Sequence, residues 1–214
     1  MTDKKDLVAL VADKNMESAL AGLLGRHLAF GTREIRWEIY VHPERDPGCL
    51  RKSHTFLRSQ SSNFEHALVM FDREGSGREA RQATELEAEV ERALSTNGWD
   101  DRAAALVLDP ELEVWVWSDS PEVDQVLGWA GREPDLRAWL HDNDEVWPKT
   151  SSNRRTGKPE RPKEAMEQAL KLVNRPRSSA YYSTLARTIS VERCTDRTFL
   201  KTRDCLRRWF GQSA

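Results

Sequence analysis

The sequence predicts an α/β fold in which a mostly parallel four-stranded sheet is flanked by helices in three layers, with a helical appendage at the C-terminus. Three uninterrupted apolar runs support this prediction, at residues 7–12, 67–71 and 103–108. Each run is too short for a helix and does not alternate in polarity, which is typical of strands buried on both faces of a parallel sheet. Helical spacing of apolar residues between the runs predicts the covering layers.

The first strand is expected at residues 6–12, and it leads into a helix at about 15–29. Apolar residues recur at helical spacing there, and Asn15 can cap the helix. The second strand, 35–41, alternates in polarity, which favours a half-exposed position. A short basic helix is then expected at about 50–62.

The third strand runs straight into acidic residues and a glycine-rich turn at residues 75–77. This turn is not a phosphate-binding P-loop, because the Gly-Lys-Ser/Thr ending is absent. A helix is expected at about 78–96. Its polar side is interpreted as a solvated face, and it carries Glu85, Glu87, Glu89 and Glu91.

The fourth strand, 103–108, ends at Asp109-Pro110. Asp109 is a good helix cap and Pro110 a good first helical residue, so a helix is predicted to begin there. Short helical pieces are expected across 119–148.

The last third of the chain reads as a basic appendage that follows an α/β domain, so the predicted division is 1–148 and 149–214. Residues 149–162 are polar, basic and interrupted by prolines, which predicts an exposed, mobile loop. Helices are expected at about 162–174, 180–188 and 195–210. The last helix should dock through its aromatic residues and leave its basic side to solvent.

Charge is distributed unevenly along the chain. The formal net charge is −2, but residues 149–214 hold 16 Lys and Arg against 6 Asp and Glu. The first 148 residues hold 17 against 29. An acidic body with a basic end suits a protein that meets nucleic acid, and two halves that neutralise each other explain the split equally well.

The three cysteines share no metal-ligand spacing and are interpreted as free thiols in a reducing cytoplasm. The N-terminus has no signal-peptide pattern, and no apolar run reaches membrane-spanning length. These features predict a soluble cytoplasmic protein with no membrane partner.

Acidic residues follow three of the four predicted strands at the point where each strand ends. They are Asp13 and Glu17 after the first strand, Asp72 and Glu74 after the third, and Asp109, Glu111 and Glu113 after the fourth. In an open parallel sheet, ligands bind outside the carboxyl ends of the strands. Asp72 and Glu74 are two residues apart on an extended segment, so both can face one ion. The sequence therefore predicts an acidic divalent-metal site.

Several polar residues near this edge have simpler explanations. Glu17 taken alone complements the helix dipole. Of Glu111 and Glu113, one is expected to point at the strand ends but not both. Asp46 belongs to a polar loop rich in proline and glycine, and is left outside the predicted site together with His42 and Glu44.

These segments resemble the Toprim family. Residues 13–17 resemble a degenerate Glu-Gly-x-Thr-Glu/Asp motif, with Asp13 for the glutamate and Lys14 for the glycine. Residues 71–75 resemble the Asp-x-Asp motif with Glu at the second acid. Residues 109–115 resemble the Pro-x-x-Glu-x-Trp segment of Toprim-like prokaryotic proteins, many of which are encoded beside phage-defence genes. Residues 190–199, with the later Trp209-Phe210, resemble their helical tail.

The resemblance implies a Toprim-like core, Mg²⁺ or Mn²⁺ bound by the strand-end acids, and phosphodiester chemistry on nucleic acid. On this resemblance the catalytic residues are Asp13 as general acid/base, with Glu17, Asp72 and Glu74. The implied metal-binding residues are Asp13, Asp72, Glu74 and Glu113.

Two functions therefore stand at this stage. The first is a Mg²⁺-dependent nuclease or nucleic-acid-processing protein of a phage-defence system, with a further defence protein as a partner. Its phosphate contacts would be Arg154, Arg155 and Lys158, although a solvated linker explains those residues as well. The second is a catalytically inactive Toprim-like subunit that binds a partner protein or nucleic acid.

Overall fold

A computed structural model describes residues 4–212, with the side chain of Arg154 outside the described part. Its strands are β1 (Lys5–Val11), β2 (Trp37–Val41), β3 (Phe64–Asp72) and β4 (Ala103–Leu108). All neighbouring pairs are parallel, in the order β2-β1-β3-β4. The predicted α/β fold with a four-stranded parallel sheet is confirmed.

Helices cover both faces of this sheet and extend beyond its carboxyl end. They are α1 (Lys14–Leu24), α2 (His27–Phe30), α3 (Arg45–Leu57), α4 (Ala83–Leu94), α5 (Glu113–Val116), α6 (Glu122–Leu127), α7 (Leu136–Asp142), α8 (Pro162–Leu172), α9 (Ser179–Thr188) and α10 (Arg197–Phe210), with short turns η1 (Arg58–Gln60), η2 (Ser95–Trp99) and η3 (Ser152–Arg155).

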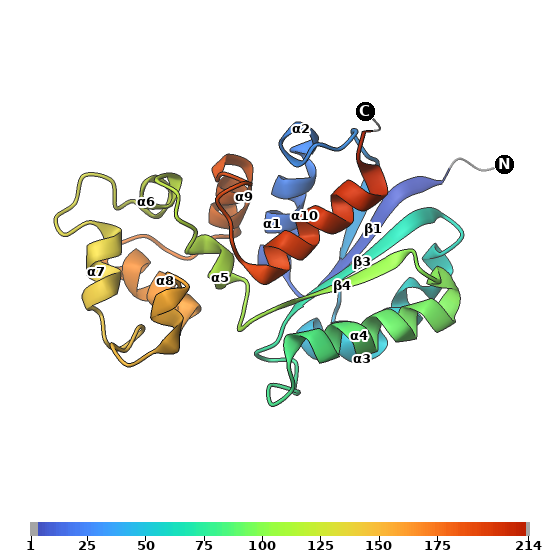
Figure 1. Cartoon of the computed structure of the whole chain (residues 1–214), viewed down its shortest axis with the longest axis horizontal. Coiled ribbons are helices and arrows are strands. Elements are labelled where there is room, and N and C mark those ends of the chain that lie inside the picture. Colours follow the sequence, from blue (N-terminus) through green and yellow to red (C-terminus); the bar gives the residue numbers. More distant parts are fainter. Residues whose placement is uncertain (1–3, 213–214) are drawn as a thin grey trace.

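The layers of the core are clear in Figure 1, where α3 and α4 lie on one face of the sheet and α1 and α10 on the other. Helix α9 packs along α1, and Gly22 makes their close approach possible: a Cβ there would lie 2.7 Å from the Cβ of Ala186. Helices α5 to α8 extend outward past the carboxyl ends of the strands (Figure 1). None of the helices within residues 4–212 has both the length and the apolar character needed to cross a bilayer.

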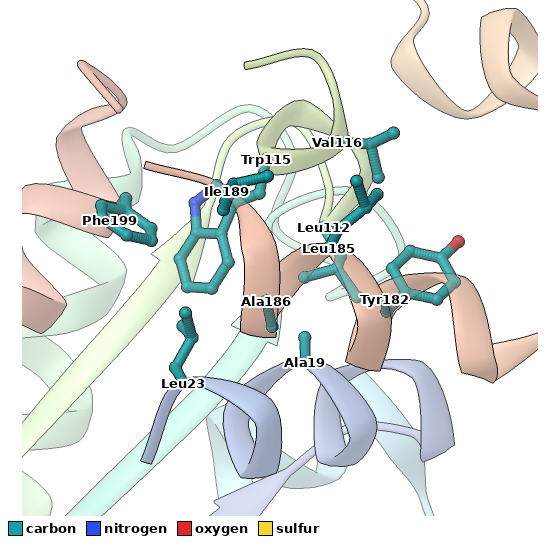
Figure 2. Close-up of a pocket in the computed structure, with 10 residues that line it drawn as sticks. All are labelled: Ala19, Leu23, Leu112, Trp115, Val116, Tyr182, Leu185, Ala186, Ile189 and Phe199. Atoms are coloured by element: carbon teal, nitrogen blue, oxygen red, sulfur yellow. The ribbon is translucent and has the colours of Figure 1, made fainter. Parts of the chain in front are cut away.

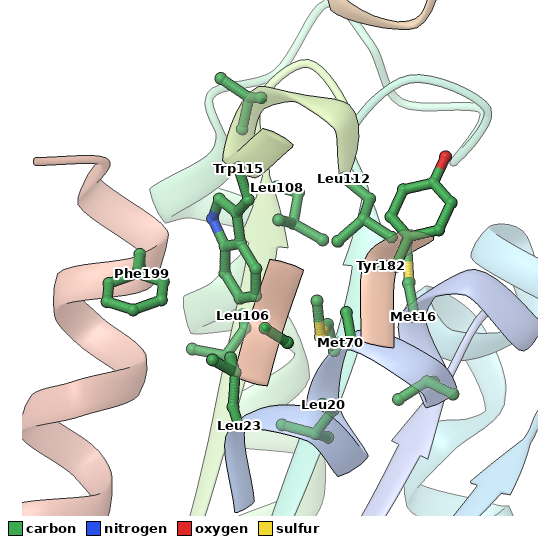
Figure 3. Close-up of a cluster of buried hydrophobic side chains, with 14 of the residues drawn as sticks. Met16, Leu20, Leu23, Met70, Leu106, Leu108, Leu112, Trp115, Tyr182 and Phe199 are labelled. Atoms are coloured by element: carbon green, nitrogen blue, oxygen red, sulfur yellow. The ribbon is translucent and has the colours of Figure 1, made fainter. Parts of the chain in front are cut away.

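The C-terminal helices contribute to the same apolar core as the sheet. Figure 3 shows Tyr182 of α9 and Phe199 of α10 beside side chains of α1, β3, β4 and α5. Phe199 is fully buried and meets the Trp115 ring edge-on at 5.4 Å between centroids. The apolar pocket between α1, α5 and α9 in Figure 2 has a volume of about 20 Å³, which is room for about one water molecule. It is a packing gap rather than a ligand site.

Several predicted helices differ in their limits. The helix expected at 15–29 is interrupted at Gly25 and divides into α1 and α2. Helix α3 begins at Arg45, five residues before the expected start, because Pro47 is compatible with a first helical turn. Asp109 does not cap a helix, since α5 begins only at Glu113. Its carboxylate instead accepts from Arg73 Nε at 2.8 Å.

The polar side of α4 is not entirely a solvated face. β4 is an edge strand, and its outward N–H groups need acceptors. Glu87 accepts from Val107 N at 3.0 Å, and Glu91 accepts from Ala105 N at 3.0 Å. Glu87 is buried, with 3% of its surface exposed. Two glutamates of α4 thus supply the hydrogen-bond acceptors that the edge strand lacks.

The basic side of α10 is also different from the prediction. Arg197 binds Glu87 through both terminal nitrogens at 2.9 Å, and Lys201 bridges Glu87 and Glu91. These cations join α10 to α4 along the outer edge of β4, so they are engaged by carboxylates, although the Arg197 side chain is still 44% exposed. Arg207 and Arg208, later in α10, are exposed as predicted.

Candidate functional site

Asp72 is the last residue of β3 and lies at the carboxyl edge of the sheet, opposite Leu108 of β4. Its Oδ1 is sealed from solvent and has no hydrogen-bond partner among the described residues. Burial raises the pKa of Asp72 well above its usual value. Four neighbouring carboxylates raise that pKa further, namely Asp46, Glu113, Glu111 and Asp13. The strand-end acids therefore gather around Asp72.

Asp46 belongs to this cluster although the sequence interpretation left it outside the site. It lies in the first turn of α3, and its Oδ1 accepts from the backbone N–H of Asp72 at 2.8 Å. Burial, and then the charge of Asp13, raise the pKa of Asp46, against the lowering effect of that hydrogen bond. Its position at the start of the helix that follows the half-exposed second strand is the signal that could have identified it.

Asp13 reaches the cluster from the end of β1, where it caps α1. Its Oδ1 accepts from the N–H groups of Asn15 and Met16 at 2.9 Å. Glu17, one turn later, is engaged by Lys14 at 2.6 Å. The lysine that stands in place of the motif's glycine therefore pairs with Glu17.

Glu111 and Glu113 are both buried, and the charges of both raise the pKa of Asp72, so both lie near the strand ends. Glu111 precedes α5 instead of lying within it, which frees it from helical geometry. Its Oε1 accepts from Lys163 N at 3.0 Å. Burial, and then the charge of Glu113, raise its pKa to about 7.

Glu113 is already occupied by partners from the C-terminal segment. The Tyr182 hydroxyl donates to it at 2.5 Å, and Arg177 lies 3.5 Å from the same oxygen. Burial, and then the charge of Glu113, raise the pKa of Tyr182, so this hydroxyl keeps its proton. Glu113 is better placed to hold α5 against α9 than to bind a metal ion.

Glu74 does not lie beside Asp72 as the spacing predicted. β3 ends at Asp72 and the chain turns at once, with Ser76 N donating to Arg73 O at 3.3 Å. The rule that side chains two apart share a face applies only to extended backbone. Glu74 is exposed, and its charge contributes to the raised pKa of Glu111.

The carboxylates suit a hard cation, since Mg²⁺ takes oxygen ligands and keeps several waters. The sealed, unpartnered oxygen of Asp72 is the kind of group that such a cation would satisfy. In residues 4–212, however, no three Asp, Glu, His or Cys side chains are positioned to hold one metal ion together. The acids lie close enough to raise the pKa values of Asp72, Asp46 and Glu111 without sharing one ion-sized position. Asp72, Asp46 and Asp13 have the donor chemistry to hold a cation.

The three basic residues expected to contact phosphate differ in their surroundings. The side chain of Arg154 lies outside the described part of the structure, and Arg155 is exposed. Lys158 is buried, and its ammonium donates to Val114 O at 2.7 Å. The predicted mobile loop is therefore anchored at Lys158, which ties residues 156–160 to α5.

Replacing Glu111 by glutamine is expected to stabilise the metal-free protein at about pH 8. The folded chain holds a proton on Glu111 that the unfolded chain releases between its ordinary pKa of 4.5 and about 7. Stability therefore falls as pH rises through that window, by at most about 3 kcal/mol. Glutamine keeps an acceptor for Lys163 N and removes the cost. Urea unfolding across this pH range measures the effect.

The control for this variant is Glu164→Gln, on the exposed surface of α8. It should leave the pH dependence of unfolding as it is in the wild type. If both variants give the same profile as the wild type, Glu111 does not carry the burial cost assigned to it.

Comparison with known proteins identifies no protein similar to this chain. No protein-family model matches this chain, and no curated protein or solved structure is significantly similar to it.

Proposed function

We propose that this protein binds a divalent cation, Mg²⁺ or Mn²⁺, at the acids around Asp72 and uses it in phosphodiester chemistry on nucleic acid. The observation that carries the proposal is the sealed, unpartnered Oδ1 of Asp72, surrounded by four other carboxylates. A cation would relieve both the repulsion and the missing contact. The resemblance of residues 13–17 and 71–75 to Toprim motifs supports the same chemistry.

Each residue of the site has a distinct part in this proposal. Asp72, Asp46 and Asp13 would hold the cation, which when bound stabilises charge on a phosphoryl oxygen. Glu111, with a pKa of about 7, can exchange a proton at physiological pH. Tyr182 and Arg177 fix Glu113 and so keep α5 in place beside the site. Glu74 and Glu17 lie outside this set.

Calorimetric titration of the purified protein with Mg²⁺ and Mn²⁺, followed by nicking assays on plasmid DNA and on RNA, tests the proposal. Saturable cation binding together with metal-dependent nicking supports it. A protein that binds neither cation overturns it.

The second candidate is a non-catalytic subunit that binds a partner protein or nucleic acid. Two observations favour it: Glu113 is already hydrogen-bonded and ion-paired, and within residues 4–212 no three acids are placed to share one ion. Nucleic-acid binding without cation binding would select this candidate. Restriction or ATPase genes beside this gene would support a defence role for either one.

A further inference from the structure

A basic pocket with a volume of about 510 Å³ lies at the turn that follows α5. Four separate segments line it: the end of α5 with the following turn, helix α7, residues 155–158, and residues 193–195. These segments are distant in sequence, so the pocket exists only in the folded chain.

The charge of the pocket is strongly positive. Its lining contains Arg137, Arg155, Lys158 and Arg193, against a single carboxylate, Asp119. Arg155 and Arg193 are exposed. Neither side chain donates a hydrogen bond to another described residue. Their guanidinium groups are free to bind an anion bidentately.

An independent observation comes from Ser118, which also lines this pocket. Only 3% of its surface is exposed, and its hydroxyl is sealed with no hydrogen-bond partner among the described residues. Buried hydroxyls without a partner are uncommon in proteins, and they call for a missing ligand group or water. Arg137 donates to the carbonyl of the same residue and so fixes its position.

Lys158 connects this pocket to the strand ends. It lines both this pocket and a neighbouring hollow that reaches Asp109 and Pro110 at the end of β4. Val114 O is the one acceptor that the described residues give its ammonium, which has three donors. A phosphate chain bound in the pocket could therefore continue along this hollow toward the acidic edge.

We propose that Arg137, Arg155, Arg193 and Ser118 form a binding pocket for a phosphate group of a nucleic-acid backbone. The phosphate itself is inferred from the pocket alone. The choice of a polynucleotide as its source rests on the proposed function, in which a phosphodiester must be held beside the Asp72 cluster.

The test measures binding of a short fluorescein-labelled single-stranded DNA in EDTA, so that no metal contributes. The double variant Arg155→Glu/Arg193→Glu should bind about tenfold more weakly or worse, because two charge-assisted contacts are lost. The magnitude of the slope of log K against log salt should fall by about 0.7, because one phosphate is no longer neutralised. Both side chains are exposed, so folding should be unaffected.

The matched control is Arg58→Glu/Arg92→Glu, which reverses two exposed arginines on the layer of α3 and α4. It changes the net charge equally and should keep the wild-type salt slope. Ser118→Ala changes no charge and should weaken DNA binding about fivefold while the protein stays folded, since its hydroxyl has no partner to lose among the described residues.

Equal loss of affinity in the two double variants would overturn the proposal, because it would show a general charge effect. No DNA binding by the wild type would also overturn it. Inorganic phosphate should compete with DNA on the wild type; binding of phosphate without binding of DNA would overturn the polynucleotide as its source. DNA binding in EDTA does not depend on a bound cation, so failure of the cation site and failure of this pocket are distinguishable.

Discussion

Replacing Asp72 by asparagine is expected to abolish cation binding and any metal-dependent cleavage, while making the metal-free protein more stable at neutral pH. The carboxylate sits among Asp46, Glu111, Glu113 and Asp13, and its Oδ1 has no partner among the described residues. A neutral amide of the same shape removes the repulsion, and its N–H₂ group can donate to the surrounding carboxylates.

The sign of the pH effect follows from the raised pKa of Asp72. The folded protein keeps a proton on this group above pH 3.8, where the unfolded chain releases it, so stability falls as pH rises from that value toward the folded pKa. The stability of the asparagine variant should not fall in this way as pH rises. A residue such as Asp72, which destabilises the fold, is expected at a position where function requires it.

Thermal unfolding with and without Mg²⁺ separates the two effects. Wild-type protein should gain about 2.7 kcal/mol at a Mg²⁺ concentration one hundred times Kd. Asp72→Asn should gain nothing and yet unfold at a higher temperature than the wild type in EDTA. Glu74→Gln, which changes an exposed acid two residues away, should behave as the wild type in both conditions. Cation stabilisation that survives in Asp72→Asn would show that the ion binds elsewhere.

The contrast between Asp72 and Glu74 shows what could be predicted from the sequence. Uninterrupted apolar runs predicted three of the four strands correctly. Because parallel strands bring their carboxyl ends to one edge of the sheet, the position of an acidic site could be predicted from these local patterns. The orientation of each acid did not follow, because it depends on where the strand stops. The prediction misplaced Glu74 because the chain turns one residue after Asp72.

Asp46 and Ser118 show a different limit. Each becomes a candidate through contacts with segments far away in the chain: Asp46 with the N–H of Asp72, and Ser118 with Arg137 and the basic pocket. Pro47 and Gly48 made the start of α3 look like a loop, and no periodic pattern marks either residue. Tertiary contact decides their roles.

Replacing Glu87 by alanine is expected to lose about 1–3 kcal/mol of unfolding free energy, because the buried N–H of Val107 loses its acceptor. The Glu87 carboxylate accepts from the edge-strand N–H of Val107, from both terminal nitrogens of Arg197 and from Lys201. Alanine would leave that N–H without its acceptor and would remove the carboxylate partner of Arg197, whose side chain is 44% exposed. It would also remove the contacts of Arg197 and Lys201 with Glu87, which leaves the Lys201–Glu91 pair to join α10 to α4.

The matched control is Glu89→Ala, on the same helix. Glu89 pairs with Arg81, and both side chains are more than a third exposed, so the loss should stay below about 1 kcal/mol. A second variant, Glu87→Leu/Arg197→Met, replaces the buried pair by apolar groups and should cost less than Glu87→Ala alone. Equal losses for Glu87→Ala and Glu89→Ala in urea unfolding would contradict the assigned role.

The pH dependence of Glu87 is opposite to that of Asp72. Burial alone would raise its pKa, but hydrogen bonds from Arg197 and Val107 N and the charge of Lys201 hold it below the usual value of 4.5. Its stabilisation is therefore complete above pH 4.5 and is lost as pH falls through the folded pKa. Acid unfolding of wild type should lose this contribution, and Glu87→Ala should show a shallower acid limb. The slopes of unfolding free energy against pH for the Glu87 and Asp72 variants therefore have opposite signs. They distinguish Glu87, which stabilises the fold, from Asp72, which destabilises it.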